Sequence, residues 1–411
     1  MHCVRASHSY SPEDEEDVEL SEVVTPWASS VLTGSDLIRA SKYNKGLAFS
    51  HAEREKLYLR GLLPPAELSQ ELQSERVMAN VRETKREVDR LQYLLSLGER
   101  NEQLFHYVLA AHLAEILPLL EHPTTAACCQ KYSLMFRALP RALYVTSEDA
   151  GSVDSILRNW PERDVRVVCV TDGQECGPLG DLGVQAIGTP LSRLALYTAA
   201  GGVRPASCLP VVLDVGTDNA RLLADPIYVG LKKRRDAGEA VEELRDELVA
   251  SLRARYGPAL LLDCEDMRYA TAEAFVEACQ GLFPAYSDAV HGFPAVVLAA
   301  VLAALPSTHS PRLADHTFLF VGEGPELLAV VRLVEEAVLA QGGALGTVWD
   351  IRERIALVDA KGLVVRERPD AEDYADGVLP YARDLPPAES LLQAVRAVKP
   401  TVLVGLTRGA R

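Results

Sequence analysis

The sequence lacks several features that would place it in a common class. It has no uninterrupted run of about 18 apolar residues, so we expect no membrane-spanning helix. None of its eight cysteines forms a C-x-x-C pair, and most lie in apolar runs such as VVCVTD, which favours reduced, buried thiols over a redox motif. Lys and Arg (42) are outnumbered by Asp and Glu (58), and the resulting net charge of −16 argues against a nucleic-acid-binding surface.

The chain has 411 residues, of which 48% are hydrophobic, so it is long enough for two or three domains with their own cores. Residues 1–36 contain the acidic stretch PEDEEDVELSE and predict a disordered tail. The first residues, MHCVRASHSYS, hold no acid and faintly resemble a transit peptide, but the acids that follow are unusual for one. The compartment, mitochondrial or cytoplasmic, therefore stays open.

Three regions with different patterns follow the tail. Residues 37–140 are predicted to be helical, because apolar residues recur at three- and four-residue spacing between residues 68 and 120. Residues 141–285 contain short β-branched runs (ALYVTS, VRVVCVTDG, LPVVLDVGT, ALLLDCED) that alternate with helical stretches, which predicts an α/β domain with a parallel sheet. Residues 286–411 contain HTFLFVGEGPE, a strand followed by a Gly-rich turn and a long helix, which predicts a Rossmann-like domain.

Three acids follow one of the predicted buried strands, in the segment ALLLDCEDMRY. Asp263, Glu265 and Asp266 would repel one another without a counter-charge, and oxygen ligands of this kind suit a divalent metal ion. The segment therefore predicts a metal site at the carboxyl end of a strand, where ligands of parallel sheets bind. The alternative is an acid pair that is hydrated or neutralised by the nearby Arg268.

Four longer blocks resemble the signature blocks of malic enzymes: YNKGLAFSHAEREKLYLRGLLPP, NWPERDVRVVCVTDG, LALYTAAGGVRPASCLPVVLDVGTDN and FLFVGEGPE. They occur in the order and at the spacing of that family, from about Leu37 to the last residue. The resemblance implies a helical N-terminal region, a parallel-sheet catalytic domain and an incomplete Rossmann-like NAD-binding domain. It also implies oxidative decarboxylation of L-malate to pyruvate and CO2, with NAD or NADP and Mg2+ or Mn2+.

By this resemblance, Glu265 and Asp266 match the family's metal-binding Glu-Asp pair. Asp288 matches the first acid of a downstream segment, but the acid that supplies the third ligand is replaced by Ala289. A methyl group supplies no oxygen to a hard cation. The metal site is therefore expected to be incomplete, with Glu265, Asp266 and Asp288 as its remaining acids.

Three catalytic positions of the family are also substituted. Arg193, in GTPLSRL, stands where the family has its lysine base, and a guanidinium does not release a proton at neutral pH. Glu121 stands at the position of the tyrosine acid, where a buried carboxyl could still serve if its pKa were raised. Glu175 stands where an arginine binds the malate carboxylate, so the charge that faces a dicarboxylate is reversed.

The cofactor positions are partly kept. Gly322 and Gly324 preserve the tight turn, but Leu327 occupies the third small position of the motif. Asp359, at the end of the strand RIALVD, is expected to accept hydrogen bonds from the adenine ribose and so to favour NAD over NADP. Binding of NAD, NADP or a metal ion is therefore doubtful.

The chain ends directly after the strand PTVLVGL, whereas the family continues, so we expect either a fragment or a protein that has lost those parts. Together, the substitutions favour an inactive pseudoenzyme with a structural or regulatory role. The alternatives are an active malate dehydrogenase (decarboxylating) with altered catalytic residues, and a degenerate reading frame, so whether the protein is an enzyme stays open. By resemblance, we expect a homo-oligomer, or a hetero-oligomer with a paralogue or a larger complex.

Overall fold

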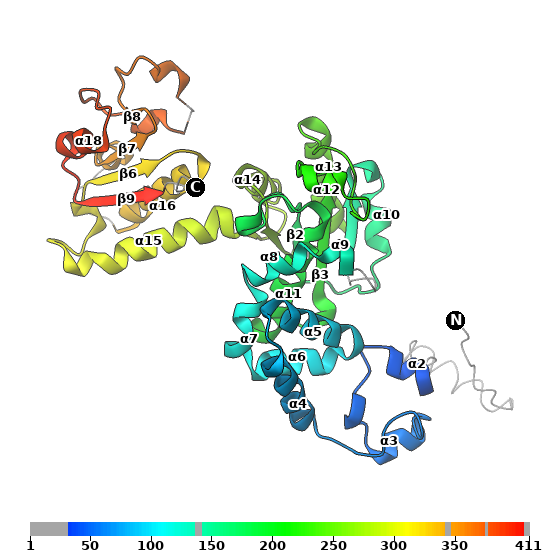
Figure 1. The fold of residues 1–411 in the computed structure, drawn as a ribbon. Helices are drawn as coiled ribbons and strands as arrows, with labels where there is room; N and C mark the ends of the chain where they lie inside the picture. Colours follow the sequence, from blue (N-terminus) through cyan, green and yellow to red (C-terminus); the bar gives the residue numbers. More distant parts are fainter. Residues whose placement is uncertain (1–31, 136–141, 342–346, 375–376, 407–411) are drawn as a thin grey trace, which may run out of the picture. The chain divides into compact units, whose positions relative to one another are not determined.

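The computed structural model describes residues 32–135, 142–341, 347–374 and 377–406 (Figure 1). The chain divides into two compact units, Met1–Cys128 with Ala195–Pro205, and Cys129–Leu194 with Ala206–Arg411. The predicted tail of residues 1–36 lies almost entirely outside the described residues. The predicted domain limits near residues 140 and 285 stay predictions.

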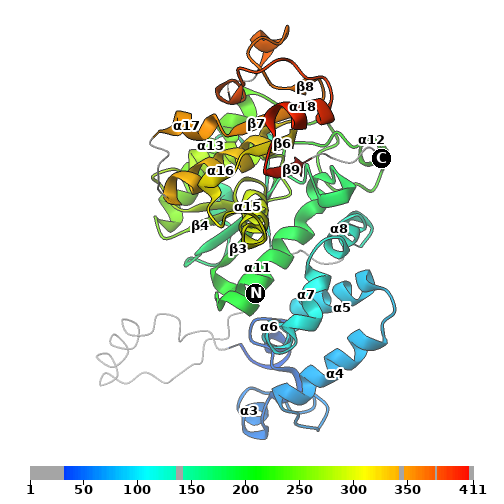
Figure 2. The same ribbon diagram turned by 90° about the vertical axis from the view of Figure 1, so that its left-hand side faces the viewer.

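The first unit is helical, as the spacing of apolar residues predicted. Its helices α4, α5, α6 and α7 pack together through their apolar faces (Figure 2), and α5 buries Leu91, Leu94 and Leu97. The side chain of Asn101 caps the start of α6, and Ser50 forms a capping box with Glu53 at the start of α3. The bounds are α2 Gly34–Arg39, α3 His51–Lys56, α4 Gln70–Glu83, α5 Glu87–Arg100, α6 Glu102–Ala111, α7 Leu113–Leu120 and α8 Thr124–Cys129.

The second unit begins with a parallel five-stranded sheet in the order β1-β3-β2-β4-β5. Four of its strands match the four predicted runs, because strands buried on both faces have continuous apolar sequences. The strands are β1 Leu143–Thr146, β2 Val167–Thr171, β3 Cys208–Asp214, β4 Leu261–Glu265 and β5 Ala285–Ser287. The helices of this part are α9 Tyr132–Met135, α10 Val153–Arg158, α12 Ala220–Ala224, α13 Glu239–Tyr256 and α14 Tyr269–Ala278. Helix α11, Gly188–Gly201, belongs to the second unit as far as Leu194 and to the first unit from Ala195 on.

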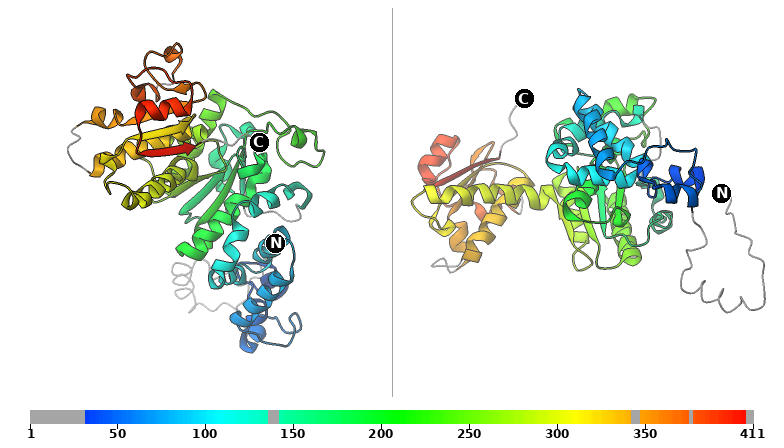
Figure 3. Two further views of the ribbon diagram at one scale, coloured as in Figure 1. Left: turned by 60° about the vertical axis from the view of Figure 1, so that its left-hand side comes forward. Right: turned by 90° about the horizontal axis from the view of Figure 1, so that it is seen from below.

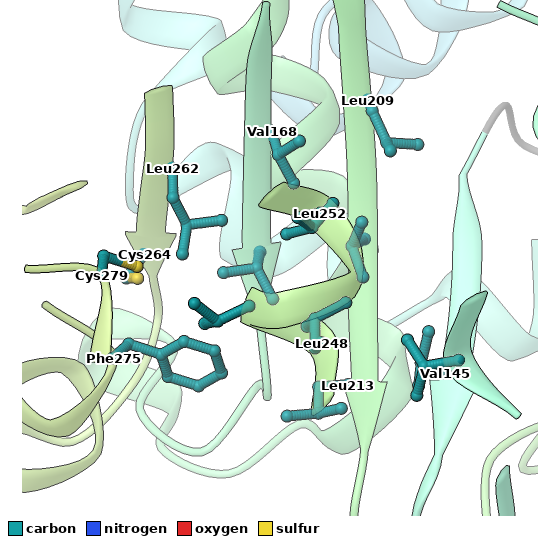
Figure 4. Packing of buried hydrophobic residues seen from close by; sticks show 14 of the residues in the cluster. Val145, Val168, Leu209, Leu213, Leu248, Leu252, Leu262, Cys264, Phe275 and Cys279 are labelled. Atoms are coloured by element: carbon teal, nitrogen blue, oxygen red, sulfur yellow. The ribbon is translucent and has the colours of Figure 1, made fainter. Parts of the chain in front are cut away.

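One face of this sheet packs against α10, α13 and α14 in a dry core. Leu248 and Leu252 of α13 lie over Leu209 and Leu213 of β3 (Figure 4). Leu262 and Cys264 of β4 belong to the same core. Because side chains alternate along a strand, Asp263 and Glu265 point to the opposite face of the sheet. This alternation places the acids of β4 away from the apolar core.

The rest of the second unit contains a four-stranded sheet in the order β8-β7-β6-β9, in which only β8 is antiparallel. Phe318 and Phe320 of β6 pack with α16, whereas Leu319 packs with α18, so the two helices cover opposite faces (Figure 3). The bounds are β6 Phe318–Gly322, β7 Ile355–Asp359, β8 Gly362–Leu363, β9 Val402–Leu406, α15 Phe293–Ala304, α16 Pro325–Gln341, α17 Val348–Arg352 and α18 Leu391–Val398. The predicted α/β fold, with a helical N-terminal region and a Rossmann-like sheet, is confirmed.

One helical stretch of the described residues, Asp288–Ser307, is long and apolar enough to cross a membrane, and the bent pair α6 and α7 passes the same test as one span. This statement considers only the length and the composition of the helices, and one or two such helices are weak evidence for a membrane span. The sequence scan missed the stretch because His291 interrupts its apolar run. The expected absence of a membrane span stays a prediction.

Candidate functional site

Arg193 joins two of the predicted site acids. It lies on α11, and its Nε is 2.7 Å from Oε1 of Glu265 at the end of β4. Its Nη2 donates to Oδ2 of Asp288 at 2.8 Å, and Asp288 also accepts from the hydroxyl of Tyr286 at 2.5 Å. The Glu265 side chain is 6% exposed and the Arg193 side chain 25% exposed. Three positions predicted from the sequence therefore meet in one ion-paired cluster.

Burial and the neighbouring Arg193 have opposite effects on the pKa of Glu265. Burial raises its pKa well above the ordinary value, while the charge and hydrogen bond of Arg193 pull it down. Burial also raises the pKa of the Tyr286 hydroxyl, and the hydrogen bond to Asp288 adds to that shift. In this cluster the guanidinium pairs with one buried carboxyl, that of Glu265, and with one largely exposed carboxyl, that of Asp288.

Asp266 is fixed differently from Glu265, although it is the next residue. Its backbone adopts a left-handed conformation with φ +53°, which Asp tolerates better than most residues. Its Oδ2 accepts from the hydroxyl of Thr189 at 2.6 Å, and its backbone carbonyl accepts from the amide of Glu175 at 2.9 Å. The structure therefore brings the loop that carries Glu175 against the acid pair, as the resemblance implied.

The residues present do not fit a divalent metal ion. Within the described part of the chain, no group of three or more His, Cys, Asp or Glu side chains is arranged to hold one. The two carboxylates that would face an ion, Glu265 and Asp288, are spanned by Arg193, and Ala289 adds no oxygen. Arg268, offered by the sequence as the residue that neutralises the acid pair, is exposed, and among the described residues Arg193 is the cation paired with Glu265. The hydration of the acid pair stays a prediction.

A buried ion-pair network, which the sequence analysis missed, organises the neighbouring loops. Arg235 donates to both carboxylate oxygens of Asp181 at 2.8 and 2.9 Å, and to the backbone carbonyl of Asp172 at 2.8 Å. Asp181 also accepts from the hydroxyl of Thr217 and the amide of Asp218. Asp172 lies in the block NWPERDVRVVCVTDG, and Thr217 and Asp218 lie in the block that ends with VGTDN, both quoted for the family resemblance. Polar residues inside such interior-looking blocks were the signal that could have revealed the network.

The two acids of this network have opposite pKa shifts. Burial raises the pKa of Asp172 to about 6, although Arg235 opposes the shift. Burial acts the same way on Asp181, but the hydrogen bonds and charge of Arg235 dominate and hold the pKa of Asp181 below its ordinary value. Asp181 is therefore the charged partner of Arg235, and Asp172 is the more easily protonated acid.

Glu121, the predicted replacement for the family's tyrosine acid, belongs to the first unit. It is the C-cap residue of α7 and is partly buried, and its carbonyl accepts from the amide of Thr125 at 3.1 Å. Arg193, Glu265 and Asp288 belong to the second unit. The role of Glu121 as an acid stays a prediction.

The Gly-rich turn between β6 and α16 has the backbone expected of a phosphate-binding turn. Gly324 has φ +96°, and Gly322 has φ +149° and passes so close to β9 that a Cβ would lie 2.6 Å from the carbonyl oxygen of Leu406. Leu327, at the third small position, is instead buried in the core between α16 and the sheet. The two glycines therefore suit the backbone of the turn and its close approach to β9, while Leu327 serves packing.

Asp359, the predicted ribose acceptor, is already paired. Arg368 donates from Nη1 to Oδ1 at 2.9 Å and from Nη2 to Oδ2 at 2.5 Å, and its side chain is only 8% exposed. The amide of Lys361 also donates to Oδ1 at 2.8 Å. A ribose hydroxyl would have to use the remaining lone pairs, so the preference of Asp359 for NAD over NADP stays a prediction.

Two models of known protein families match the sequence of this chain. A family model of the malic enzyme N-terminal domain matches residues 98–280, and a model of the malic enzyme NAD-binding domain matches residues 290–411. The chain belongs to the malic enzyme family. The two matches meet near the short strand β5, and the second begins just before α15.

Curated malic enzymes are similar over most of this chain. The NADP-dependent malic enzyme of Phaseolus vulgaris is 43% identical over 383 residues, which are 93% of this chain and 64% of that protein. NADP-dependent malic enzyme 1 of Arabidopsis thaliana is 41% identical over 391 residues, 95% of this chain and 66% of that protein. This chain thus spans less than two thirds of the length of these relatives.

Solved malic enzyme structures are more distant. The malic enzyme of Entamoeba histolytica covers 87% of this chain and 62% of its own, with 15% identity and a TM-score of 0.43. The NAD-dependent malic enzyme of Thermotoga maritima covers 72% of this chain and 63% of its own, with 17% identity and a TM-score of 0.42. The family assignment rests on the sequence matches.

Proposed function

We propose that this malic enzyme family member is a pseudoenzyme: it keeps the fold but does not oxidise malate, and it has a structural or regulatory role. The observation that carries the proposal is the position of Arg193. A guanidinium stands at the place of the family's lysine base, where it forms ion pairs with Glu265 and Asp288. Such a group stays protonated at neutral pH and cannot accept a proton from the substrate.

Two further substitutions support the proposal. Glu175 replaces the substrate arginine, and its amide is bonded to the carbonyl of Asp266, so its loop is at the acid pair. A carboxylate there adds negative charge next to a site meant for a dicarboxylate. Ala289 removes the third metal ligand. Base, substrate counter-charge and metal ligand are separate requirements of the reaction, and a single loss of selection for turnover accounts for all three.

The second candidate is an active malate dehydrogenase (decarboxylating) with altered residues. The identity of 41–43% with NADP-dependent malic enzymes over more than nine tenths of the chain favours it. It would need Glu121 as the acid and a different proton acceptor. It would also need the cofactor, NAD or NADP, to bind at the turn of Gly322 and Gly324, and a metal ion to displace Arg193.

Thermal melting separates the two candidates. A ligand that binds only the folded protein must raise the melting temperature. We expect no shift with malate and Mn2+, added separately or together, and cooperative melting throughout. A rise that requires malate and Mn2+ together would contradict the pseudoenzyme. We also propose that the chain forms an oligomer. Size-exclusion chromatography with light scattering on the purified chain tests this proposal, and a purely monomeric peak would exclude a homo-oligomer.

A further inference from the structure

The acid cluster of the second unit is spanned by a single cation from its own chain. Arg193 uses two different nitrogens for two different carboxylates, Nε for Glu265 and Nη2 for Asp288. The two acids come from separate elements, the end of β4 and the turn Asp288–Gly292 before α15. The guanidinium thus links α11, β4 and this turn, as an ion shared between their carboxylates would.

Arginine does this with two separate nitrogens, whereas lysine would have to reach both acids with one. Its planar guanidinium presents donors in several fixed directions, whereas the ammonium of lysine is a compact point charge. One nitrogen of Arg193 lies within 2.7 Å of Glu265 and another within 2.8 Å of Asp288. Replacing the family's lysine by arginine therefore keeps the charge and gives each of the two acids its own nitrogen.

Ala289, at the position of the family's third acid, also reduces the need for a metal ion in this cluster. A third carboxylate beside Glu265 and Asp288 would add to a negative charge that one guanidinium offsets only in part. With Ala289 in that position, the cluster has fewer acids to neutralise. Arg193 and Ala289 are therefore compensating changes, because one supplies a cation that cannot dissociate and the other removes an acid that would require a second cation.

We propose that the Arg193 guanidinium is a permanent internal counter-ion that replaces the divalent metal ion of this acid cluster, so that the protein folds and functions independently of Mg2+ and Mn2+. This inference deepens the proposed function and rests on it, because a cluster closed by Arg193 has no metal to activate malate. A metal ion and the guanidinium exclude each other, since both need the same carboxylate oxygens and their charges repel.

Mn2+ binding, measured by loss of the electron paramagnetic resonance signal of free Mn2+, tests the inference without reference to activity. The chains compared are wild type, R193A, the double variant R193A/A289D, and R268A as a control that removes an exposed arginine from the same region. We expect no saturable binding to wild type or R268A at millimolar Mn2+. We expect R193A to bind weakly and R193A/A289D to bind at least about tenfold more tightly than R193A, because ligand charge and number set the affinity.

Saturable Mn2+ binding by wild type as tight as that of R193A/A289D would overturn the inference, and so would the absence of binding by the folded double variant. If the alanine variants do not fold, R193K decides instead, because it keeps the charge but replaces the two paired nitrogens of the guanidinium by one. R193K should melt below wild type and be stabilised by Mn2+; a melting temperature equal to that of wild type and insensitive to Mn2+ would overturn the inference. Malate turnover by wild type would overturn the proposed function, whereas Mn2+ binding by wild type without turnover would overturn this inference alone.

Discussion

Arg193 on α11 and Glu265 at the end of β4 form an ion pair of 2.7 Å in which the carboxylate is almost completely buried. The pair lies at the edge of the sheet where the carboxyl ends of the parallel strands meet, the place where such folds bind their ligands. In this malic enzyme family member, a side chain of the protein itself occupies the space between the acids.

The first prediction concerns the energy of this pair. R193M leaves the buried Glu265 without its cation, and removing one partner of a buried pair costs about 3 kcal/mol or more. R193M/E265Q removes both charges and should be more stable than R193M. Urea unfolding of wild type, both single variants and the double variant gives the coupling energy. A double variant that is less stable than R193M would show that Arg193 does not stabilise the protein by neutralising Glu265.

The second prediction is a pH dependence that comes from Asp172. Because burial raises its folded-state pKa to about 6 from 3.8, the folded protein binds a proton more tightly than the unfolded chain does. Its contribution to stability is therefore complete below about pH 4 and is lost as the pH rises to about 6, by up to about 3 kcal/mol. D172N should remove this loss. Denaturation of both proteins across that range provides the check, and parallel pH profiles would contradict it.

The third prediction compares two cations, Arg368 and Lys361, that form ion pairs beside the Rossmann-like sheet. Arg368 is 8% exposed and pairs with Asp359 and Asp370, whereas Lys361 is 67% exposed and also pairs with Asp370. R368M should destabilise the protein by about 3 kcal/mol. K361M should destabilise the protein much less than R368M, because an exposed pair is screened by water. Equal effects in chemical denaturation would mean that burial does not set the difference.

The fourth prediction concerns the close approach of the Gly-rich turn to β9. In G322A the new Cβ would lie 2.6 Å from the carbonyl oxygen of Leu406, in a backbone conformation that alanine rarely adopts. We expect a loss of about 2 kcal/mol or more. G405A is the matched control, because a Cβ at Gly405 in β9 meets no atom within 4 Å. Urea melts in which G405A is as destabilised as G322A would rule out the close approach as the cause.

Much of the fold could be predicted from the sequence because it depends on local patterns. The runs that form β2 and β3 are almost continuously apolar, since these strands are buried on both faces, and the apolar run ALLL leads into β4. The turn of Gly322 and Gly324 was recognisable because only glycine suits its backbone. The short strand β5, Ala285–Ser287, has too few residues to show a pattern and was missed.

The sequence predicted which residues form the candidate site, but not which of them contact one another. The family resemblance identified Glu265, Asp288 and Arg193 as site positions, but it could not show that the guanidinium lies between the two acids. The proximity of Arg268 in the sequence suggested it as the neutralising residue, but Arg193 is the cation paired with Glu265. The left-handed backbone of Asp266 redirects the chain between Glu265 and Arg268, and that turn depends on tertiary contacts to Thr189 and Glu175.

The most direct test of the pseudoenzyme is malate-dependent reduction of NAD or NADP in the presence of Mn2+, followed by absorbance. The matched control is the variant E265Q/D266N, which lacks the acid pair that the family uses for its metal. The account predicts that wild type and this variant show the same rate, equal to that of buffer. A wild-type rate above buffer that E265Q/D266N abolishes would contradict it.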